Sequence, residues 1–127
     1  AVGKIADSKQ FVQEYQAAFV GIGNNKFRNE LLQRLEQEGY EIPVLLHPTA
    51  YISKTAVIGK GTVVEPKAIV NANSKVGSGC IISVGAIVDH DVVLEDCVHV
   101  NAGAICKAGS FVAKETKLEA GQVVKGY

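Results

Sequence analysis

Aliphatic side chains return at every sixth position through the last two thirds of the chain. The phase holds without a slip across twelve complete hexads between residues 52 and 123. Neither an α-helix, with about 3.6 residues per turn, nor a strand with alternating faces produces a period of six. Four residues after each aliphatic position comes a second one that is mostly small. The aliphatic positions, with one cysteine among them, are Ile52, Ile58, Val64, Val70, Val76, Ile82, Val88, Leu94, Val100, Cys106, Val112, Leu118 and Val124.

This period predicts a parallel β-helix, in which three short strands and three corners make one coil. Each aliphatic side chain would point inward and stack on the residue eighteen positions away, as Val64 would on Ile82. Twelve hexads give four coils, roughly 19 Å tall at about 4.8 Å per strand. An irregular Val-rich sandwich would need phase breaks at its turns, and none is present. Residue types that tolerate positive φ indicate corners at Gly59, Asn71, Gly77, Gly85 and Asn101.

The first third of the chain has a different pattern. Ala18–Ile22 is a short apolar run typical of a buried strand, and Asn24 or Asn25 can cap the helix that follows. Apolar residues at helical spacing predict that helix from about Lys26 to Glu38, with Gly39 as its stop. A second strand over Ile42–Leu46 would complete a βαβ unit with parallel strands. We therefore expect a small, partial α/β lobe over residues 1–46 and a β-helix domain over 47–127.

Composition narrows the classes of partner. Thirteen basic residues balance thirteen acidic ones, so charge alone favours neither nucleic acid nor an anionic membrane. No apolar run approaches the roughly 20 residues that cross a bilayer, and the start of the chain lacks the features of a signal peptide. A cytoplasmic protein is expected. Three cysteines without a CxxC pair favour small core residues over disulfides or a thiolate metal site.

Only three histidines are present, at positions 47, 90 and 99. Some β-helices of this kind bind zinc through three histidines and hydrate carbon dioxide, but His47 lies before the first complete hexad. We therefore expect no metal site. The Gly21–Asn25 stretch lies between a strand and a helix N-terminus, where backbone N–H groups can bind phosphate oxygens or simply form a capped turn. Six basic residues could attract the phosphates of CoA or a nucleotide, but most of them are expected on solvated faces: Lys26, Arg28, Lys54, Lys60, Lys67 and Lys75.

Three stretches carry a family resemblance. They are Gly21-Ile22-Gly23-Asn24-Asn25 with its helix, His47-Pro48-Thr49-Ala50 before the hexads, and Ala86-Ile87-Val88-Asp89-His90-Asp91 followed by Cys97-Val98-His99-Val100. With the hexads, they resemble the hexapeptide-repeat acyltransferases, in the branch of sialic acid O-acetyltransferases and nucleotide-aminosugar N-acetyltransferases of the UDP-N-acetylbacillosamine type. The resemblance implies a mainly β fold with a left-handed β-helix. It also implies a homotrimer with acetyl-CoA along the seam between two β-helices and the nucleotide sugar at the N-terminal lobe.

The same resemblance assigns roles to individual residues. His90 matches the general base, which suits an imidazole with a pKa near working pH, and Asp91 takes the place of its acidic partner. His99 matches a histidine that contacts acetyl-CoA, and the backbone N–H of Ala108 is expected to face the thioester carbonyl oxygen. Gly23 and Asn24 match the substrate-binding loop. The first strand and helix of the family's lobe, and about one later coil, have no counterpart in this sequence.

The function expected from the sequence is acetyl-CoA-dependent acetylation of a sugar, as N-acetylation of a nucleotide-linked amino sugar. Acetylation of a hydroxyl on sialic acid or another sugar is the alternative within the same chemistry. A trimeric β-helix scaffold without activity is the alternative of another class. The apolar residues that would line the outer faces of the prism favour association in every one of these cases. These outward residues are Val63, Ile69, Ile81, Ile87 and Val93.

Overall fold

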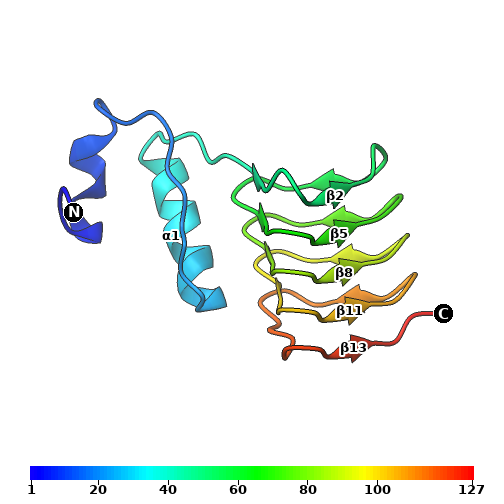
Figure 1. Ribbon diagram of the computed structural model, residues 1–127. Helices are drawn as coiled ribbons and strands as arrows, with labels where there is room; N and C mark the ends of the chain where they lie inside the picture. Colours follow the sequence, from blue (N-terminus) through cyan, green and yellow to red (C-terminus); the bar gives the residue numbers. More distant parts are fainter.

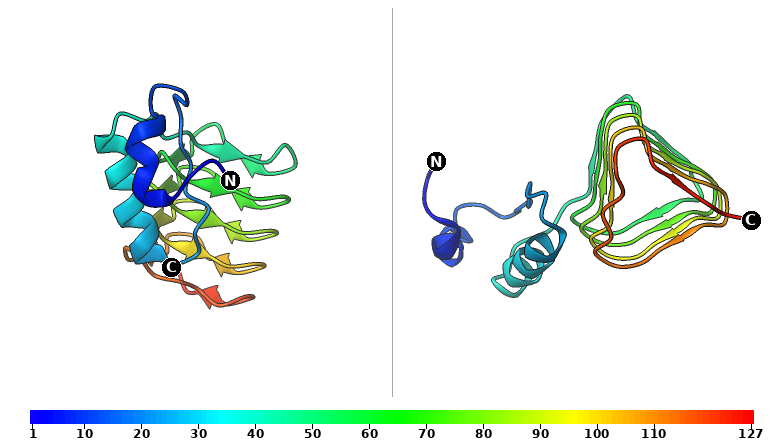
Figure 2. Two further views of the ribbon diagram at one scale, coloured as in Figure 1. Left: turned by 90° about the vertical axis from the view of Figure 1, so that its left-hand side faces the viewer. Right: turned by 90° about the horizontal axis from the view of Figure 1, so that it is seen from below.

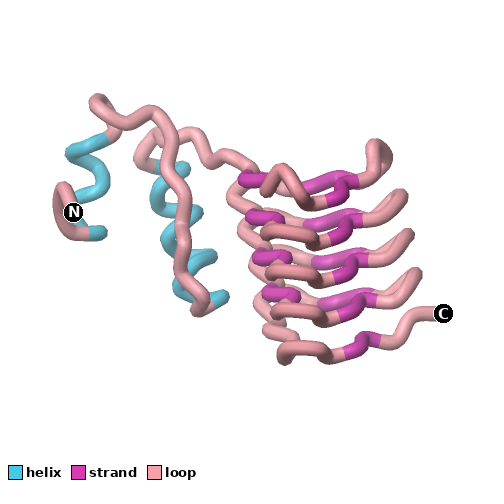
Figure 3. Tube along the Cα trace, viewed as in Figure 1, coloured by secondary structure: helices cyan, strands magenta, loops and turns pink.

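A computed structural model describes all of residues 1–127, as a small N-terminal lobe beside a stack of β-helical coils (Figure 1). The lobe contains the 3-10 helix η1 (Ile5–Phe11) and the α-helix α1 (Asn25–Gln37). Thirteen strands of two residues each follow, separated by loops of four residues except for the longer loop 113–122 between β12 and β13 (Figure 3). The strands are β1 (Leu45–Leu46), β2 (Tyr51–Ile52), β3 (Val57–Ile58), β4 (Val63–Val64), β5 (Ile69–Val70), β6 (Lys75–Val76), β7 (Ile81–Ile82), β8 (Ile87–Val88), β9 (Val93–Leu94), β10 (His99–Val100), β11 (Ile105–Cys106), β12 (Phe111–Val112) and β13 (Val123–Val124).

The strands form three parallel sheets that make the sides of a triangular prism (Figure 2). Their orders are β1-β4-β7-β10, β2-β5-β8-β11-β13 and β3-β6-β9-β12. Each strand pairs with the strand one coil away in a register of eighteen residues, as Val64 does with Ile82 and Ile82 with Val100. The β-helix predicted from the hexads is confirmed.

The core of the prism contains both residue classes of the hexad. Aliphatic side chains such as Val64, Ile82 and Val100 have no exposed surface, and the small residues Ala68 and Ala86 are equally buried. Burying one Ile or Val side chain contributes about 1.5–3 kcal/mol. Because every coil repeats the same two inward positions, the core is a continuous column of stacked layers. The cysteines are buried as expected, although Cys97 packs against the lobe and not inside the prism.

The corners follow the hexad too, but at another position than we predicted. Positive φ values between 56° and 71° occur at every sixth residue from Gly61 to Gly121. Of the predicted corner residues only Gly85 is among them, so the prediction was wrong by two positions for Gly59, Asn71, Gly77 and Asn101.

Close approach of the backbone, and not positive φ, accounts for Gly59 and Gly77. A Cβ on Gly59 would lie 2.6 Å from the backbone of Gly77 in the next coil. The asparagines at this hexad position use their side chains instead: the Oδ1 atom of Asn71 accepts the backbone N–H of Ala72 at 2.8 Å.

Helix α1 begins and ends at sites that the sequence indicates. The N–H of Phe27 donates to Oδ1 of Asn24 at 2.9 Å, which makes Asn24 the N-cap, and Gly39 has φ of +100° just after the helix. The helix packs along one corner of the prism (Figure 2), where Leu32 covers Gly61 and Gly79.

The predicted βαβ unit is wrong. Residues 18–22 form no strand, and the only bridge in the region is a parallel one between Ala17 and Glu41. Leu45–Leu46, expected in the second strand of that unit, instead pairs with β4 and opens the first coil of the β-helix. At residues 45 and 46 the segment extends the eighteen-residue register of the β-helix by pairing with Val63 and Val64, whereas the lobe offers only the Ala17–Glu41 bridge. The division at residues 46 and 47 stays a prediction.

Candidate active site

His90 lies at the corner between β8 and β9, with about half of its side chain exposed. Its Nδ1 atom is 2.8 Å from Oδ2 of Asp91, the residue with φ of 57° that turns this corner. The exposed fractions of the two side chains are 46% and 45%, so the pair is open to solvent while joined internally. Adjacent corner residues are thus brought into direct contact by the left-handed backbone.

Neighbouring groups hold this pair in place. The backbone N–H of His90 donates to Oδ1 of Asp89 at 2.8 Å, and Nδ2 of Asn73, one coil earlier, donates to Oδ1 of Asp91 at 3.3 Å. The hydrogen bond with Asp91 is the main cause that raises the pKa of His90, and the same bond lowers the pKa of Asp91. Nδ1 therefore carries the proton shared with the carboxylate, which leaves Nε2 free to accept one.

Tyr127, the last residue of the chain, also contacts the carboxylate of Asp91. Its hydroxyl donates to Oδ2 of Asp91 at 3.3 Å, and its ring centroid is 6.4 Å from that of His90. The ring lies across Gly109, where a Cβ would overlap it. The hexad pattern could not predict a role for Tyr127. Its ring fits at this corner only because Gly109, one coil after Asp91, has no side chain.

Ala108 occupies the position of His90 in the following coil. In six other corners the backbone N–H at this position donates to a side-chain oxygen of Asn, Asp or Glu, whereas the N–H groups of Lys54, Lys60, Asp96 and Ala120 also lack an acceptor. The N–H of Ala108 has no backbone acceptor, and Lys107 stands where Asp89 supplies an oxygen one coil earlier. A backbone donor is therefore left free beside the corner that carries His90. The satisfied N–H groups are those of Ala72, Ser78, Val84, His90, Ala102 and Lys114.

His99 lies on another side of the prism, on β10 of the sheet that begins with β1. Its Nε2 atom is 3.0 Å from Oγ of Ser83, and its Nδ1 atom is buried without a partner. Burial is the first cause that lowers its pKa, followed by the positive charges of Arg28 and Lys117. His99 is thus a neutral imidazole, and within one chain it makes no contact with the His90 corner.

Gly23 and Asn24 lie at the N-terminus of α1, beside a third part of the molecule. They line an open cavity of about 430 Å³ together with Asn25, Lys26, Glu115 and Lys117. The structure brings these two residues together with each other but not with His90, because α1 packs along the corner of Gly61 and Gly79.

Arg28 departs from the expectation of a solvated face, because it has no exposed surface. The signal was present in the sequence. Arg28 precedes Leu31 and Leu32 by three and four positions and so shares the face of α1 that packs on the β-helix.

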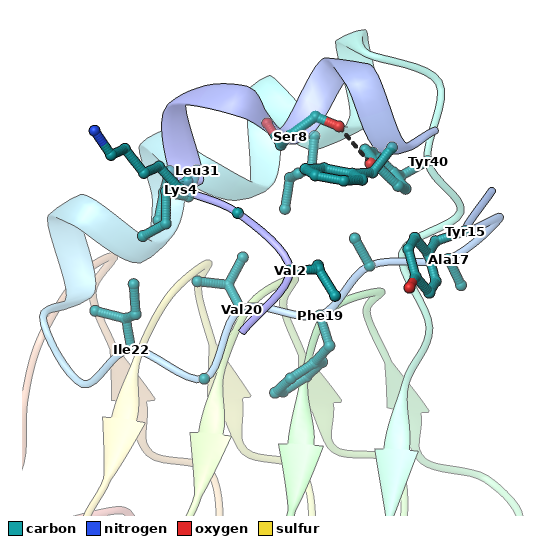
Figure 4. A pocket seen from close by; sticks show the side chains of 16 residues that line it. Val2, Lys4, Ser8, Tyr15, Ala17, Phe19, Val20, Ile22, Leu31 and Tyr40 are labelled. Atoms are coloured by element: carbon teal, nitrogen blue, oxygen red, sulfur yellow. Dashed lines mark hydrogen bonds between the residues drawn. The ribbon is translucent and has the colours of Figure 1, made fainter. Parts of the chain in front are cut away.

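The lobe also contains an apolar cavity of about 340 Å³ (Figure 4). Side chains of η1, of residues 17–22 and of α1 converge there, and the hydroxyl of Tyr40 donates to the carbonyl of Ser8 at its edge. The cavity contains no histidine or carboxylate, so it lacks the groups that acid–base chemistry needs.

Three findings concern other kinds of site. No group of three His, Cys, Asp or Glu side chains is arranged to hold a metal ion, and His47 hydrogen-bonds Thr49 in the turn before β2. No helix is long and apolar enough to span a membrane. Burial raises the pKa of Cys80 to about 12 and of Cys106 to about 11, which keeps both thiols protonated.

Comparison of the chain with solved structures gives matches over nearly its whole length. The acetyltransferase domain of PglB from Neisseria gonorrhoeae FA1090, in complex with acetyl coenzyme A, superposes with a TM-score of 0.95 and 32% identity over 99% of this chain and 62% of that one. A mutant perosamine N-acetyltransferase from Caulobacter crescentus, in complex with CoA and GDP-perosamine, gives 0.90 and 26% over 99% of this chain and 69% of that one.

This chain resembles nucleotide-sugar N-acetyltransferases. The resemblance expected from the sequence is thereby confirmed, and curated relatives agree with it. UDP-N-acetylbacillosamine N-acetyltransferase of Bacillus subtilis (strain 168) is 44% identical over 45 residues, which are 35% of this chain and 21% of that protein. GDP-perosamine N-acetyltransferase of Escherichia coli O157:H7 is 24% identical over 106 residues, 84% of this chain and 48% of that protein. The chain thus spans less than half the length of these two relatives. No family model matches it.

Proposed function

We propose that this protein transfers the acetyl group of acetyl-CoA to the amine of a nucleotide-linked amino sugar. The observation that carries the proposal is the His90–Asp91 pair, a base and its carboxylate at an exposed corner. Relatives whose names specify N-acetylation of bacillosamine and perosamine nucleotides support the same reaction, as does a similar structure that binds acetyl coenzyme A.

The proposed chemistry uses three groups of the chain. Nε2 of His90 accepts a proton as the sugar amine attacks the thioester carbonyl, while Asp91 holds the proton on Nδ1 and stabilises the imidazolium. The free N–H of Ala108 donates to the oxygen that becomes negative in the tetrahedral intermediate. Collapse of that intermediate breaks the carbon–sulfur bond, and the imidazolium returns its proton to the departing CoA sulfur.

The remaining site residues require a second chain in this proposal. Gly23 and Asn24, assigned to the sugar nucleotide, lie along a different corner from His90, and His99, assigned to acetyl-CoA, lies on a different face. A homotrimer would place one chain's His90 corner against its neighbour. Apolar residues exposed on β3, β9 and β12 of one sheet support such packing, and the exposed Lys75 of β6 lies between the first two. The apolar residues are Val57, Val93 and Phe111, at 62%, 38% and 59% exposure.

The test is CoA release from acetyl-CoA with UDP- and GDP-linked amino sugars as acceptors. We expect turnover with at least one free amine and none with the matched sugar whose amine is already acetylated. Turnover that persists with the blocked amine would instead assign O-acetylation. If calorimetry detects no acetyl-CoA binding at millimolar concentration and no acceptor supports turnover, the scaffold alternative holds.

A further inference from the structure

Arg28 is fully buried at the boundary between the lobe and the β-helix. Its guanidinium makes four hydrogen bonds: Nε to the carbonyl of Gly79 at 2.7 Å, Nη1 to that of Ile22 at 2.8 Å, and Nη2 to that of Cys97 at 3.1 Å and to Oδ1 of Asn25 at 2.7 Å. Two of these acceptors belong to successive coils and two to the loop before and at the start of α1. One side chain therefore joins the loop to the β-helix.

Every acceptor around this charge is neutral. The ion pairs of the structure are Arg34 with Glu38, Lys60 with Glu36, and His90 with Asp91, and none of them involves Arg28. Burial of an ionised group without a carboxylate is unfavourable unless hydrogen bonds satisfy its donors, and it lowers the pKa of Arg28. A charged side chain kept at this cost indicates that the geometry it imposes matters to the protein.

The geometry comes from the corners. Gly79, Cys97 and Glu115 are the left-handed residues of three successive coils, and their carbonyl groups accept no backbone N–H. Arg28 binds the first two, and Nδ2 of Asn25 donates to the third at 2.9 Å. The loop is thus fixed to three coils of the β-helix at once, although it contains no strand that could hold it.

We propose that Arg28 is a positioning residue for the sugar-nucleotide loop Gly21–Asn25, and that its fork of hydrogen bonds sets where Gly23 and Asn24 stand relative to the β-helix. This inference rests on the proposed function for the role of the loop. The carbonyl of Ile22 and the side chain of Asn25 flank Gly23 and Asn24 directly, so the loop cannot shift without breaking bonds to the guanidinium. The four acceptors surround the planar guanidinium on different sides. A lysine ammonium is compact and cannot reach all of them from one position.

The test compares Arg28→Gln and Arg28→Lys with Arg34→Gln, a matched control on the same helix whose guanidinium bonds only Glu38 and the η1 region. We expect both Arg28 variants to raise the KM for the amino-sugar nucleotide about tenfold or more, with the KM for acetyl-CoA within about twofold of wild type. The backbone amides of Phe27 and of residue 28, which donate to Asn24 at the end of the loop, report loop exchange, and they should exchange hydrogen at least about tenfold faster than in the control.

The outcomes separate this inference from the proposed function. Unchanged nucleotide KM and unchanged exchange in a folded Arg28→Gln protein would overturn the inference while leaving the acetyltransferase proposal in place, and so would full recovery by Arg28→Lys. Faster loop exchange in a chain with no acetyl transfer to any acceptor would support the positioning of the loop and reject the proposed function.

A second variant covers the case in which Arg28→Gln does not fold. Asn25→Ala keeps Arg28 but removes one of its acceptors and the link to Glu115. We expect a rise of about threefold or more in nucleotide KM and faster loop exchange. Wild-type values for both in this variant would overturn the inference.

Discussion

The backbone N–H of Gly109 donates to the carbonyl of His90 at 3.1 Å, so the corner that contains Ala108 stacks directly on the corner that contains His90. Ala108 and His90 are eighteen positions apart, which is one coil. The hexad that builds the core therefore also brings the proposed base and the proposed oxyanion donor into adjacent layers. The proximity of these two proposed groups follows from the repeat, and the properties proposed for this corner can be measured.

Asp91→Asn should change the pH dependence of acetyl transfer. The carboxylate stabilises the imidazolium and raises the pKa of His90, so its loss moves that pKa down, toward the ordinary value of about 6.5. Because the base must be neutral to accept a proton, the rising limb of the kcat/KM profile should move to lower pH. The plateau should fall by at least roughly tenfold, since the base is weaker and its tautomer is no longer fixed.

Asp89→Asn is the control for that experiment. Its Coulombic effect on His90 is smaller than the Asp91 hydrogen bond, and an asparagine keeps the oxygen that accepts the His90 N–H. We expect a smaller shift of the profile. A limb that stays in place in Asp91→Asn would show that Asp91 does not act on the base.

Gly85→Ala tests the left-handed corners. No atom would contact the added Cβ, so the cost arises only from φ of +65° and should be about 1–2 kcal/mol in the free energy of unfolding. Gly21→Ala also adds a Cβ in open space but without positive φ, and should change stability by less than about 1 kcal/mol. Denaturant unfolding at one fixed protein concentration compares the two. Equal effects would contradict the assignment of strain to this corner.

The inward column of the prism should respond to volume in a graded way. Ile82 has no exposed surface and stacks between Val64 and Val100. Ile82→Ala should cost about 2–5 kcal/mol and Ile82→Val about 0.5–1.5 kcal/mol, because the column cannot collapse around a cavity in one layer. Urea unfolding measures both. A loss below about 0.5 kcal/mol in the alanine variant would mean that the layers are not close-packed.

His99 should make the fold sensitive to acid. Burial depresses its pKa, so the stability it contributes is present above the unfolded value of about 6.5 and is lost as pH falls from there toward the lower folded value. The raised pKa of His90 changes the stability in the opposite direction as pH falls. A variant that lacks His99 is therefore needed to isolate the effect of His99. The Tm of wild type should fall more between about pH 7.5 and pH 5 than that of His99→Gln. Parallel curves would contradict the depressed pKa of the partly buried His99.

The β-helix could be predicted from the sequence because the residues that fill its core recur at every sixth position. The left-handed position could not, since Lys67, Cys97 and Glu115 occupy it in the structure alongside the glycines. Those corners are determined by the ladder of backbone hydrogen bonds between coils, which overrides the preference of the individual residue. Hence the corner prediction was two positions out of phase at Gly59, Asn71, Gly77 and Asn101 and correct only at Gly85.

In the lobe and at the site, too, some contacts could be predicted from the sequence and others could not. The contact of His90 with Asp91 could be anticipated from their adjacency. The hydrogen bonds of Arg28 could not be anticipated. Its acceptors at Gly79 and Cys97 lie 51 and 69 residues away and are backbone carbonyl groups, which leave no signal in the sequence. The βαβ prediction failed for a related reason: residues 45 and 46 have a better partner in β4 than in the lobe.

The most direct measurement of the account is steady-state acetyl transfer by His90→Ala beside wild type, with the thermal unfolding of both proteins. Removal of a general base should lower kcat by about 10²- to 10⁴-fold. Because His90 is about half exposed and outside the core, the Tm should stay close to that of wild type. Equal kcat in the two proteins would contradict the assignment of His90 as the base.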